Sequence, residues 1–371
     1  MKLITIVGAR PQFVKAAMVS HAIQAHNRAN GRLIEEYLLH TGQHYDENMS
    51  AVFFTEMGIP EPTWQLHCGS GPHGETTGRM LAGIEKIVVA EQPDFVLVYG
   101  DTNSTLAGSL AAAKLHIPVV HVEAGLRSFN KAMPEEINRI LTDHMASLLC
   151  CPTDTAVKHL EAEGIRDGVC QVGDVMYDAA LLFGKLAGKS SEILDMLGIQ
   201  SGKYRLCTVH RAENTDKEER LRGIFEAIGE MASADCPVIM PLHPRTRNYL
   251  ERYGLFSSLE ANPAIRLIQP LSFLDMVWLE KNAATILTDS GGVQKEAYFH
   301  RTPCITLRDE TEWVETVAAG WNQLAGARKE TILTCLNRQP ERKEIAEYGK
   351  GDAAKKIVEA LLELAEKMEN K

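Results

Sequence analysis

The chain has 371 residues, 45% of them hydrophobic and 24% charged, with a formal net charge of −10. This length suffices for two domains that each bury a core, and the composition is that of an ordinary soluble protein. The negative charge argues against a nucleic-acid partner or an anionic membrane surface but not against a small anionic ligand, whose binding depends on local cations.

Short apolar runs rich in β-branched residues alternate with longer helical patterns along the whole chain. Runs of this kind, separated by helices, predict parallel sheets built from right-handed βαβ units. Ten such strands exceed one ordinary doubly wound sheet, so we predict an α/β fold of two Rossmann-like domains with a ligand cleft between them. The expected strands are residues 3–7, 36–40, 95–99, 119–122, 148–151, 205–209, 238–241, 265–268, 285–287 and 304–307.

The predicted domains are residues 1–171 and residues 172–351. Residues 352–371 carry apolar side chains at helical spacing, which predicts an amphipathic helix capped by Asp352. No internal repeat or low-complexity linker is evident. This organisation favours a compact enzyme over a scaffold.

The turn after the first strand contains two cations, Arg10 and Lys15, in the sequence Gly-Ala-Arg-Pro-Gln-Phe-Val-Lys. Basic residues near a helix start are unfavourable for the helix dipole unless something negative lies between them. The alternative is two solvated surface cations. An anionic ligand is the interpretation that the unusual strand-Gly-x-Arg-Pro turn favours.

Acidic residues follow two strands of the first half. Asp101 is either the N-cap of the next helix or a carboxylate presented to the cleft. Glu123 ends a strand that should be buried, so either Arg127 or a neighbour pairs with it, or its proton affinity is raised for acid–base work. Glu135 and Glu136 begin a helix, where one acid is routine and two are noteworthy.

Two histidines occupy equivalent positions in the second half. His210 and His243 each end a strand and are each followed closely by arginine, and Arg308 follows the last strand. A single histidine is more often structural, whereas two on successive strands favour a shared anion site. A histidine there can protonate or hydrogen-bond a leaving phosphate oxygen at neutral pH.

A strand, a small glycine-rich turn and a helix follow one another at residues 285–296. Ser290, Gly291 and Gly292 lack bulk, so a phosphate could approach the free N–H groups at the helix start. Glu296 lies about one turn further, within reach of a ribose. An ordinary capped helix with glycine for tightness is the alternative interpretation.

Other ligand classes are not expected. The G-x-G-x-x-G sequence at residues 69–74 follows no convincing apolar strand, which argues against a dinucleotide cofactor. The eight cysteines show no C-x-x-C spacing, so we expect reduced core thiols and no metal site. The N-terminus has no signal-peptide h-region, and no stretch is long enough to span a bilayer, so a cytoplasmic protein is expected.

Seven motifs in order along nearly the whole chain resemble those of the non-hydrolysing UDP-N-acetylglucosamine 2-epimerases: G-A-R-P-x-x-x-K, G-D-T-N-S-T-L, H-V-E-A-G-L-R, P-E-E-x-N-R, H-R-x-E-N, D-S-G-G-x-Q-K-E-A and Y-G-x-G-x-A. The resemblance implies a glycosyltransferase-B-like fold whose last helix returns to the first domain. It also implies a homodimer without nicotinamide or metal, acting on a UDP-sugar.

The resemblance further implies that UDP is expelled from sugar carbon 1 while a base removes the proton at carbon 2, and that UDP adds back after reprotonation on the other face. Asp101, Glu123 and Glu135 would be the acids and bases, with His210 near the diphosphate and Arg10 and Lys15 opposing the charge of the leaving UDP. Which carboxylate takes the proton is undecided.

The resemblance also implies a nucleotide-binding set. Phe273 would either pack near uracil or be a core residue. The other members are Ser290, Gly291 and Gly292 at the diphosphate, Glu296 at the ribose, and His243 and Arg308 at the rim.

The chain departs from the commonest members of this family at residues 43–46 and at Trp313. Residues near Gly69 and Ser70 also lack the Arg or Gln that accompanies an allosteric UDP-sugar site, which puts such a site in doubt. The departures are similar to the subgroup acting on UDP-2,3-diacetamido-2,3-dideoxyglucuronate, an O-antigen precursor. The remaining alternatives are a hydrolysing epimerase, a sugar-nucleotide sensor without catalysis, and a glycosyltransferase of the same fold. The three carboxylates of the first half argue against the glycosyltransferase, which needs fewer.

Overall fold

The computed structural model describes residues 1–31, 34–42 and 58–370 and divides into two compact units. The first unit comprises Met1–Ala179 and Ala346–Lys371, and the second comprises Ala180–Ile345. Each unit is built on one parallel sheet, which confirms the predicted fold of two Rossmann-like domains. The unit boundaries lie eight residues after and six residues before the domain boundaries expected at residues 171 and 352.

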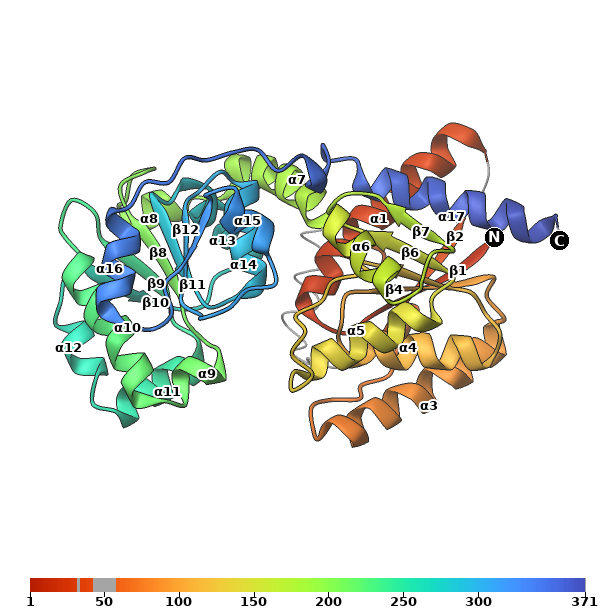
Figure 1. Cartoon of the computed structure of the whole chain (residues 1–371), viewed down its shortest axis with the longest axis horizontal. Helices are drawn as coiled ribbons and strands as arrows, with labels where there is room; N and C mark the ends of the chain where they lie inside the picture. Colours follow the sequence, from red (N-terminus) through yellow and green to blue (C-terminus); the bar gives the residue numbers. More distant parts are fainter. Residues whose placement is uncertain (32–33, 43–57, 371) are drawn as a thin grey trace. The chain divides into compact units, whose positions relative to one another are not determined.

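The first unit contains a seven-stranded sheet in the order β3-β2-β1-β4-β5-β6-β7 (Figure 1). All its neighbouring strands run parallel. Every residue of β4 and β5 is buried, which is why these strands are apolar in the sequence apart from His121 of β5. The strands are β1 (Lys2–Val7), β2 (Glu35–His40), β3 (Trp64–Gln65), β4 (Phe95–Tyr99), β5 (Val119–Val122), β6 (Leu148–Cys151) and β7 (Val169–Gln171).

Helices cover both faces of this sheet. Figure 1 shows α1 and α17, which pack together, on one face, and α3, α4 and α5 on the other. A core of side chains from α3, α4 and the central strands lies on the second face. The helices are α1 (Arg10–Asn30), α3 (His73–Glu91), α4 (Asn103–Lys114), α5 (Pro134–Met145), α6 (Asp154–Ala162), α7 (Val175–Ser190), which runs on into the second unit, a 3-10 turn η1 (Ala346–Tyr348) and α17 (Ala353–Glu369).

The second unit contains a six-stranded parallel sheet in the order β10-β9-β8-β11-β12-β13. Its strands are β8 (Arg205–Thr208), β9 (Val238–Pro241), β10 (Ile265–Ile268), β11 (Thr285–Thr288), β12 (Cys304–Thr306) and β13 (Asn322–Leu324). Two apolar cores cover it, one including α10 and α16 and the other α8, α13 and α14. Its helices are α8 (Ile193–Leu197), α9 (Ala212–Thr215), α10 (Glu218–Met231), α11 (Pro244–Arg252), α12 (Phe256–Glu260), α13 (Phe273–Asn282), α14 (Gly291–Phe299), α15 (Val314–Ala318) and α16 (Lys329–Asn337).

The strand order reverses at one place in each sheet. This place lies between β1 and β4 in the first unit and between β8 and β11 in the second. In open α/β sheets, ligands bind at the carboxyl ends of strands where the order reverses. The turns that follow these four strands, and the neighbouring turn after β5, are therefore the places to look for a site in each unit.

Two expectations about local structure were incomplete or wrong. The short strands β3, β7 and β13 were not predicted; all three lie at sheet edges and contain only two or three residues. Asp352 is at the N-cap position of α17, but its side chain makes no capping hydrogen bond. Asp178 of α7 instead accepts hydrogen bonds from the N–H groups of Ala353 at 3.2 Å and Ala354 at 2.8 Å.

The cysteines of the chain are unpaired and mostly buried. All eight cysteines are free thiols, and five of them are buried. Burial raises the pKa of Cys304 to about 12, so this thiol stays protonated at neutral pH. Within the described part of the chain, no helix has the length and apolarity to cross a membrane, and no group of three or more His, Cys, Asp or Glu side chains could hold a metal ion.

Candidate active site

Glu123 and Lys15 form a nearly buried ion pair at the carboxyl ends of the central strands of the first unit. Glu123 directly follows β5, and its backbone is left-handed with φ of 73°. Its Oε2 contacts Lys15 Nζ from α1, and the two side chains are 11% and 8% exposed. A Cβ atom on Gly100, whose own φ is 62°, would lie 3.2 Å from Glu123 Oε2 and 3.3 Å from Lys15 Nζ. Glycine after β4 therefore gives this ion pair its space.

Arg127 pairs with acids other than Glu123. Its Nη1 donates to Asp143 Oδ2 at 2.7 Å, and its Nε and Nη2 donate to the Glu163 carboxylate at 2.7 and 2.8 Å. The hydrogen bonds from Arg127 hold the pKa of Glu163 below its ordinary value. Of the two partners considered for Glu123, Arg127 or a neighbour, the structure selects the neighbour, Lys15.

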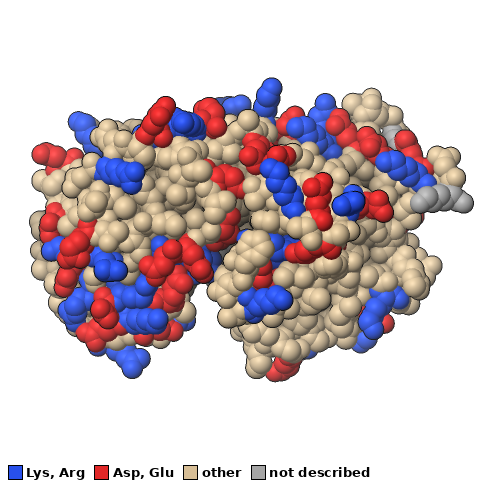
Figure 2. Space-filling model, in the orientation of Figure 1, with Lys and Arg blue, Asp and Glu red and all other residues tan. Residues whose placement is uncertain are grey.

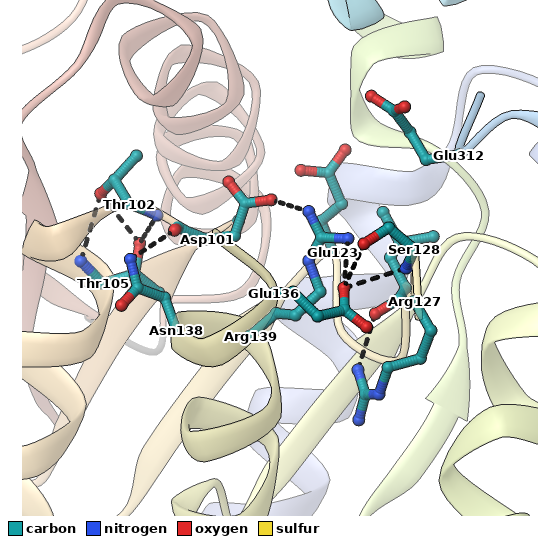
Figure 3. Close-up of polar contacts among 12 residues, drawn as sticks. Asp101, Thr102, Thr105, Glu123, Arg127, Ser128, Glu136, Asn138, Arg139 and Glu312 are labelled. Atoms are coloured by element: carbon teal, nitrogen blue, oxygen red, sulfur yellow. Dashed lines mark hydrogen bonds and ion pairs between the residues drawn. The ribbon is translucent and has the colours of Figure 1, made fainter. Parts of the chain in front are cut away.

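Asp101 follows Gly100 and forms an ion pair with Arg139 of α5 (Figure 3). The N-cap of α4 is Thr102, so the capping alternative for Asp101 is wrong. Burial raises the pKa of Asp101 above its ordinary value; the positive charge of Arg139 opposes this rise and the negative charge of Glu123 adds to it. A carboxylate with a raised pKa can exchange a proton nearer neutral pH than an ordinary one.

The two acids at the start of α5 differ in their surroundings. Glu136 is buried and accepts hydrogen bonds from Ser128 N, Ser128 Oγ and Phe129 N, each at 2.9 Å, and from Arg139 Nη1 at 3.0 Å (Figure 3). Burial opposes ionisation of Glu136, but these hydrogen bonds prevail and lower its pKa. Glu135 is half-buried, and no described residue donates a hydrogen bond to it. Glu136 thus has a structural position, and a catalytic role for Glu135 stays a prediction.

The first unit therefore gathers three of its predicted site residues around one turn. Lys15, Asp101 and Glu123 come from three different elements and meet at Gly100, and Glu135 lies on the helix that supplies the arginine partner of Asp101. The backbone of Arg10 begins α1. Its side chain lies outside the described part of the structure.

Asp289 organises the equivalent place in the second unit. It is fully buried at the end of β11, and its carboxylate accepts hydrogen bonds from the N–H groups of His210 and Arg211, each at 3.0 Å, and from Asn214 Nδ2 at 3.1 Å. His210 Nδ1 lies 3.4 Å from Asp289 Oδ1. Burial lowers the pKa of His210, with Asp289 opposing and with Arg211 and His243 adding to the change. His210 is therefore mainly neutral at pH 7.

The turn after β11 has the geometry of an anion site. Ser290 is the N-cap of α14, and its Oγ accepts a hydrogen bond from Val293 N at 3.5 Å. Gly292 is exposed, and a Cβ atom there would meet nothing nearer than Ser290 Oγ at 3.9 Å. Glu296 is half-buried on the second turn of α14. Gly292, in the first turn of α14, is thus open to solvent, and an anion can approach the helix start on its side.

Carboxylates and an arginine line the other side of this helix start. A Cβ atom on Gly291 would clash with Glu312 Oε1, so only glycine fits while Glu312 adopts this position. Arg308 is buried; its Nη1 donates to Glu312 Oε2 at 3.0 Å, and its Nε lies 3.3 Å from Glu213 Oε1. Arg308 therefore lies beside the helix terminus, where an arginine can bind an anion.

His243 and Phe273 differ in exposure. His243 is exposed at the N-cap of α11, and its ring centroid lies 5.9 Å from that of His210. The histidines of β8 and β9 therefore meet, as their positions in the sequence suggested. Phe273 is buried and packs edge-on against Phe183 with 5.1 Å between ring centroids. This is the packing of a core phenylalanine, and a contact with uracil stays a prediction.

Trp313 is buried beside the anion turn. Its exposure is 6%, Lys295 Nζ lies 4.0 Å from the centroid of its ring, and its Nε1 has no hydrogen-bond partner among the described residues. The other position that departs from the commonest family members, residues 43–46 with Tyr45 and Asp46, lies outside the described residues. Trp313 is thus the departure whose surroundings are known.

The sequence did not indicate the roles of Arg139, Asp143 and Asp289. Arg139 lies three residues after Glu136 in the P-E-E-x-N-R motif, and that helical spacing was a usable signal. Asp143 of α5 pairs with His121 and Arg127, which lie outside its own helix. Asp289 accepts hydrogen bonds from the backbone N–H groups of His210 and Arg211, which lie in the turn after β8. For these two residues, the sequence carried no comparable signal.

Comparison with known proteins gives a consistent result. The family model for UDP-N-acetylglucosamine 2-epimerase matches residues 25–362. A UDP-N-acetylglucosamine 2-epimerase homolog from Methanococcus maripaludis is 53% identical, over 98% of this chain and all of the relative. The UDP-2,3-diacetamido-2,3-dideoxy-D-glucuronate 2-epimerase of Pseudomonas aeruginosa is 50% identical, with the same coverage.

A solved structure extends the similarity to the fold. The crystal structure of Methanocaldococcus jannaschii UDP-GlcNAc 2-epimerase in complex with UDP-GlcNAc and UDP aligns with a TM-score of 0.87 at 45% identity. The alignment covers 98% of this chain and 99% of the other. The chain therefore belongs to the UDP-N-acetylglucosamine 2-epimerase family, a family of isomerases with a glycosyltransferase-B-like fold.

Proposed function

We propose that this chain inverts carbon 2 of a UDP-2-acetamido sugar, interconverting a UDP-N-acetylglucosamine-type and a UDP-N-acetylmannosamine-type sugar. Membership of the family supports this function. The observation that carries it is the presence, at one turn of the first unit, of two acids that influence each other, Asp101 and Glu123. Inversion needs one group that removes a proton from one face of a carbon and another that returns a proton to the opposite face.

The proposed reaction proceeds by elimination and re-addition. A carboxylate takes the proton from carbon 2 while the bond between carbon 1 and the UDP oxygen breaks, which leaves a 2-acetamidoglycal and UDP. A protonated acid then gives a proton to carbon 2 on the other face, and the UDP oxygen re-forms its bond to carbon 1. Asp101, Glu123 and Glu135 are the candidates for these two roles. No electron acceptor is needed, because the step is neither an oxidation nor a reduction.

The second unit is proposed to hold the UDP while it is detached. Ser290, Gly291 and Gly292 would receive the diphosphate at the start of α14, and neutral His210 would donate a hydrogen bond to it. A helix terminus contributes only about 0.3–2 kcal/mol to anion binding. Cations must therefore supply most of the remaining stabilisation of the leaving group.

Further residues complete the proposed nucleotide site. In the first unit, the cations are Lys15 and Arg10. In the second unit, Arg308 lies beside the start of α14, and Glu296 lies one turn into that helix. The proposed assignments are Arg10 and Lys15 to the leaving diphosphate, Glu296 to the ribose, His243 and Arg308 to the rim, and Phe273 to the uracil side.

The same chemistry on UDP-2,3-diacetamido-2,3-dideoxyglucuronate, for O-antigen synthesis, is the second candidate. The 50% identity to the Pseudomonas aeruginosa enzyme supports it. The tryptophan at position 313, whose indole N–H is buried beside the anion turn, also favours this substrate over the commoner one.

We further propose a cytoplasmic homodimer, with the domains at residues 1–171 and 172–351 and the final segment at 352–371. Figure 2 shows few charged side chains over the part of the first unit that carries α3, α4 and α5. Ile137 and Leu141 of α5 and Val89 of α3 are each about half exposed. An apolar face of this kind is suited to a subunit interface. Light scattering after size exclusion would show about twice the chain mass.

The function is tested by incubating the protein in deuterated water with each UDP-sugar and following the products by NMR. Deuterium at carbon 2 with UDP still attached is the expected result. Free UDP with free sugar would indicate hydrolysis, and transfer of the sugar to an added acceptor would indicate a glycosyltransferase. If no deuterium enters either substrate, the proposal is wrong.

A further inference from the structure

His121 of β5 lies beneath the turn that carries Asp101, and none of the roles described above involves it. The side chain is fully buried. Its Nδ1 lies 2.7 Å from Asp143 Oδ1, and its Nε2 lies 2.8 Å from the carbonyl oxygen of Gly100. The imidazole thus bridges α5 to the turn between β4 and Asp101.

Both neighbours of the ring can only accept hydrogen bonds. A backbone carbonyl has no proton to donate. The Asp143 carboxylate already accepts from Arg127 Nη1 at 2.7 Å and from Gly125 N at 3.1 Å. Asp143 is therefore an anion at neutral pH, and both ring nitrogens must supply the protons of their hydrogen bonds.

We infer that His121 is a buried imidazolium cation and that it is a positioning residue for the turn bearing Asp101. Its charge is compensated within a chain of alternating sign that runs from Glu163 through Arg127 and Asp143 to His121. Buried charges persist when they are paired and hydrogen-bonded in this way. The catalytic part of this inference rests on the proposed function; the charge of His121 does not.

The position of Gly100 explains why a charged donor is useful at this place. Gly100 N donates to Val122 O at 2.9 Å, so His121 Nε2 fixes the second polar group of the same peptide turn. Asp101 follows directly, and Glu123 and Lys15 lie against Gly100. Hydrogen bonds from ionised donors are roughly twice as strong as neutral ones. One imidazolium therefore holds the backbone turn that carries Asp101 and against which the Glu123 side chain lies.

Neutron diffraction from crystals of the perdeuterated wild-type protein tests the charge directly. Deuterium on both Nδ1 and Nε2 of His121, with none on Asp143, is the expected result. A bare ring nitrogen, or a deuterium on the Asp143 carboxylate, would overturn the inference. The measurement needs no variant and no substrate, so its outcome is independent of the proposed function.

The positioning role is tested by His121→Gln, which keeps a donor of similar reach but removes the charge. His116→Gln, at an exposed histidine just after α4, is the matched control. We expect His121→Gln to lower kcat roughly ten- to a hundredfold with KM and UDP affinity within about twofold, because misplacement of a catalytic group affects chemistry more than binding. Wild-type kcat in His121→Gln would overturn the positioning role. If the wild-type enzyme shows no deuterium entry at carbon 2, the proposed function is refuted instead.

Discussion

Asp178→Asn should make the protein more stable at neutral pH. The Asp178 carboxylate faces the first turn of α17, but burial, together with the charges of Asp174 and Asp352, raises its pKa to about 6 although the N–H groups of Ala353 and Ala354 donate to it. The folded protein therefore holds a proton at Asp178 that the unfolded chain releases near its ordinary value of 3.8. As a result, stability decreases as the pH rises between these two values.

The size of the effect follows from the pKa change. About two pH units correspond to about 3 kcal/mol at pH 7, because each unit is worth about 1.4 kcal/mol. Asparagine has one carbonyl oxygen and keeps one of the two hydrogen bonds, and losing the other costs about 1 kcal/mol. The net gain is about 2 kcal/mol at pH 7, which is a rise in Tm of roughly 4–8 °C for a domain of about 200 residues. At pH 4 only the loss of about 1 kcal/mol remains.

Differential scanning calorimetry of the full chain at pH 7 and pH 4 measures this reversal. Asp352→Asn is the matched control on the same helix. Burial opposes its ionisation, but Lys356 lowers the pKa of Asp352, so its carboxylate stabilises the folded state at neutral pH and the substitution should lower Tm there. A lower Tm for Asp178→Asn at pH 7 would refute the reasoning, because it would show that the charge of Asp178 stabilises the start of α17.

Three further predictions concern the site. Asp101→Asn and Glu123→Gln should each abolish deuterium entry while UDP affinity, measured by calorimetry, changes no more than several-fold; a large loss of UDP binding would show that these carboxylates are structural. Arg139→Met removes a positive charge that lowers the pKa of Asp101, so this pKa should rise further. The acid limb of the pH profile of kcat/KM should then move to higher pH. If the acid limb does not move, Asp101 is not the base that titrates there. The negative charge of bound UDP should raise the pKa of His210, which burial lowers in the free protein. The UDP affinity of the wild type should therefore increase more than that of His210→Asn as the pH falls towards 6. If the UDP affinities of the two proteins change with pH in the same way, His210 lies away from the diphosphate.

The central strands of both sheets were predictable because of how they are buried. β4 and β5 are covered on both faces, and apart from His121 in β5 their residues form the apolar runs that such burial favours. The edge strands β3, β7 and β13 could not be predicted in the same way. They have only two or three residues and are partly exposed, so they leave no apolar run in the sequence.

The residues of the candidate site were easier to predict than their partners. The polar residues after β1, β4 and β5 are conspicuous because each group directly follows a buried strand. The motifs that contain them indicate the family. The partner of Glu123 is Lys15, which is 108 positions away in the chain. Pairing of this kind depends on the order of strands in the sheet and leaves no local pattern.

The same limit applies to helix ends. Asp352 is next to α17 in the sequence, so it was the expected cap, but Asp178 accepts the hydrogen bonds of the first turn from 175 and 176 positions away. Local capping rules consider only neighbours in the chain. A tertiary contact can replace the local cap, and only the folded structure shows it.

The most direct test of the central claim is positional isotope exchange in the substrate. UDP-N-acetylglucosamine, and in parallel the diacetamidoglucuronate analogue, would carry ¹⁸O in the bond between carbon 1 and the β-phosphate. If UDP leaves and returns, the label must spread to the non-bridging oxygens of the β-phosphate at a rate at least comparable with deuterium entry at carbon 2. Deuterium entry with the label still wholly in the bridge would show that the bond to UDP never breaks, and would contradict the account.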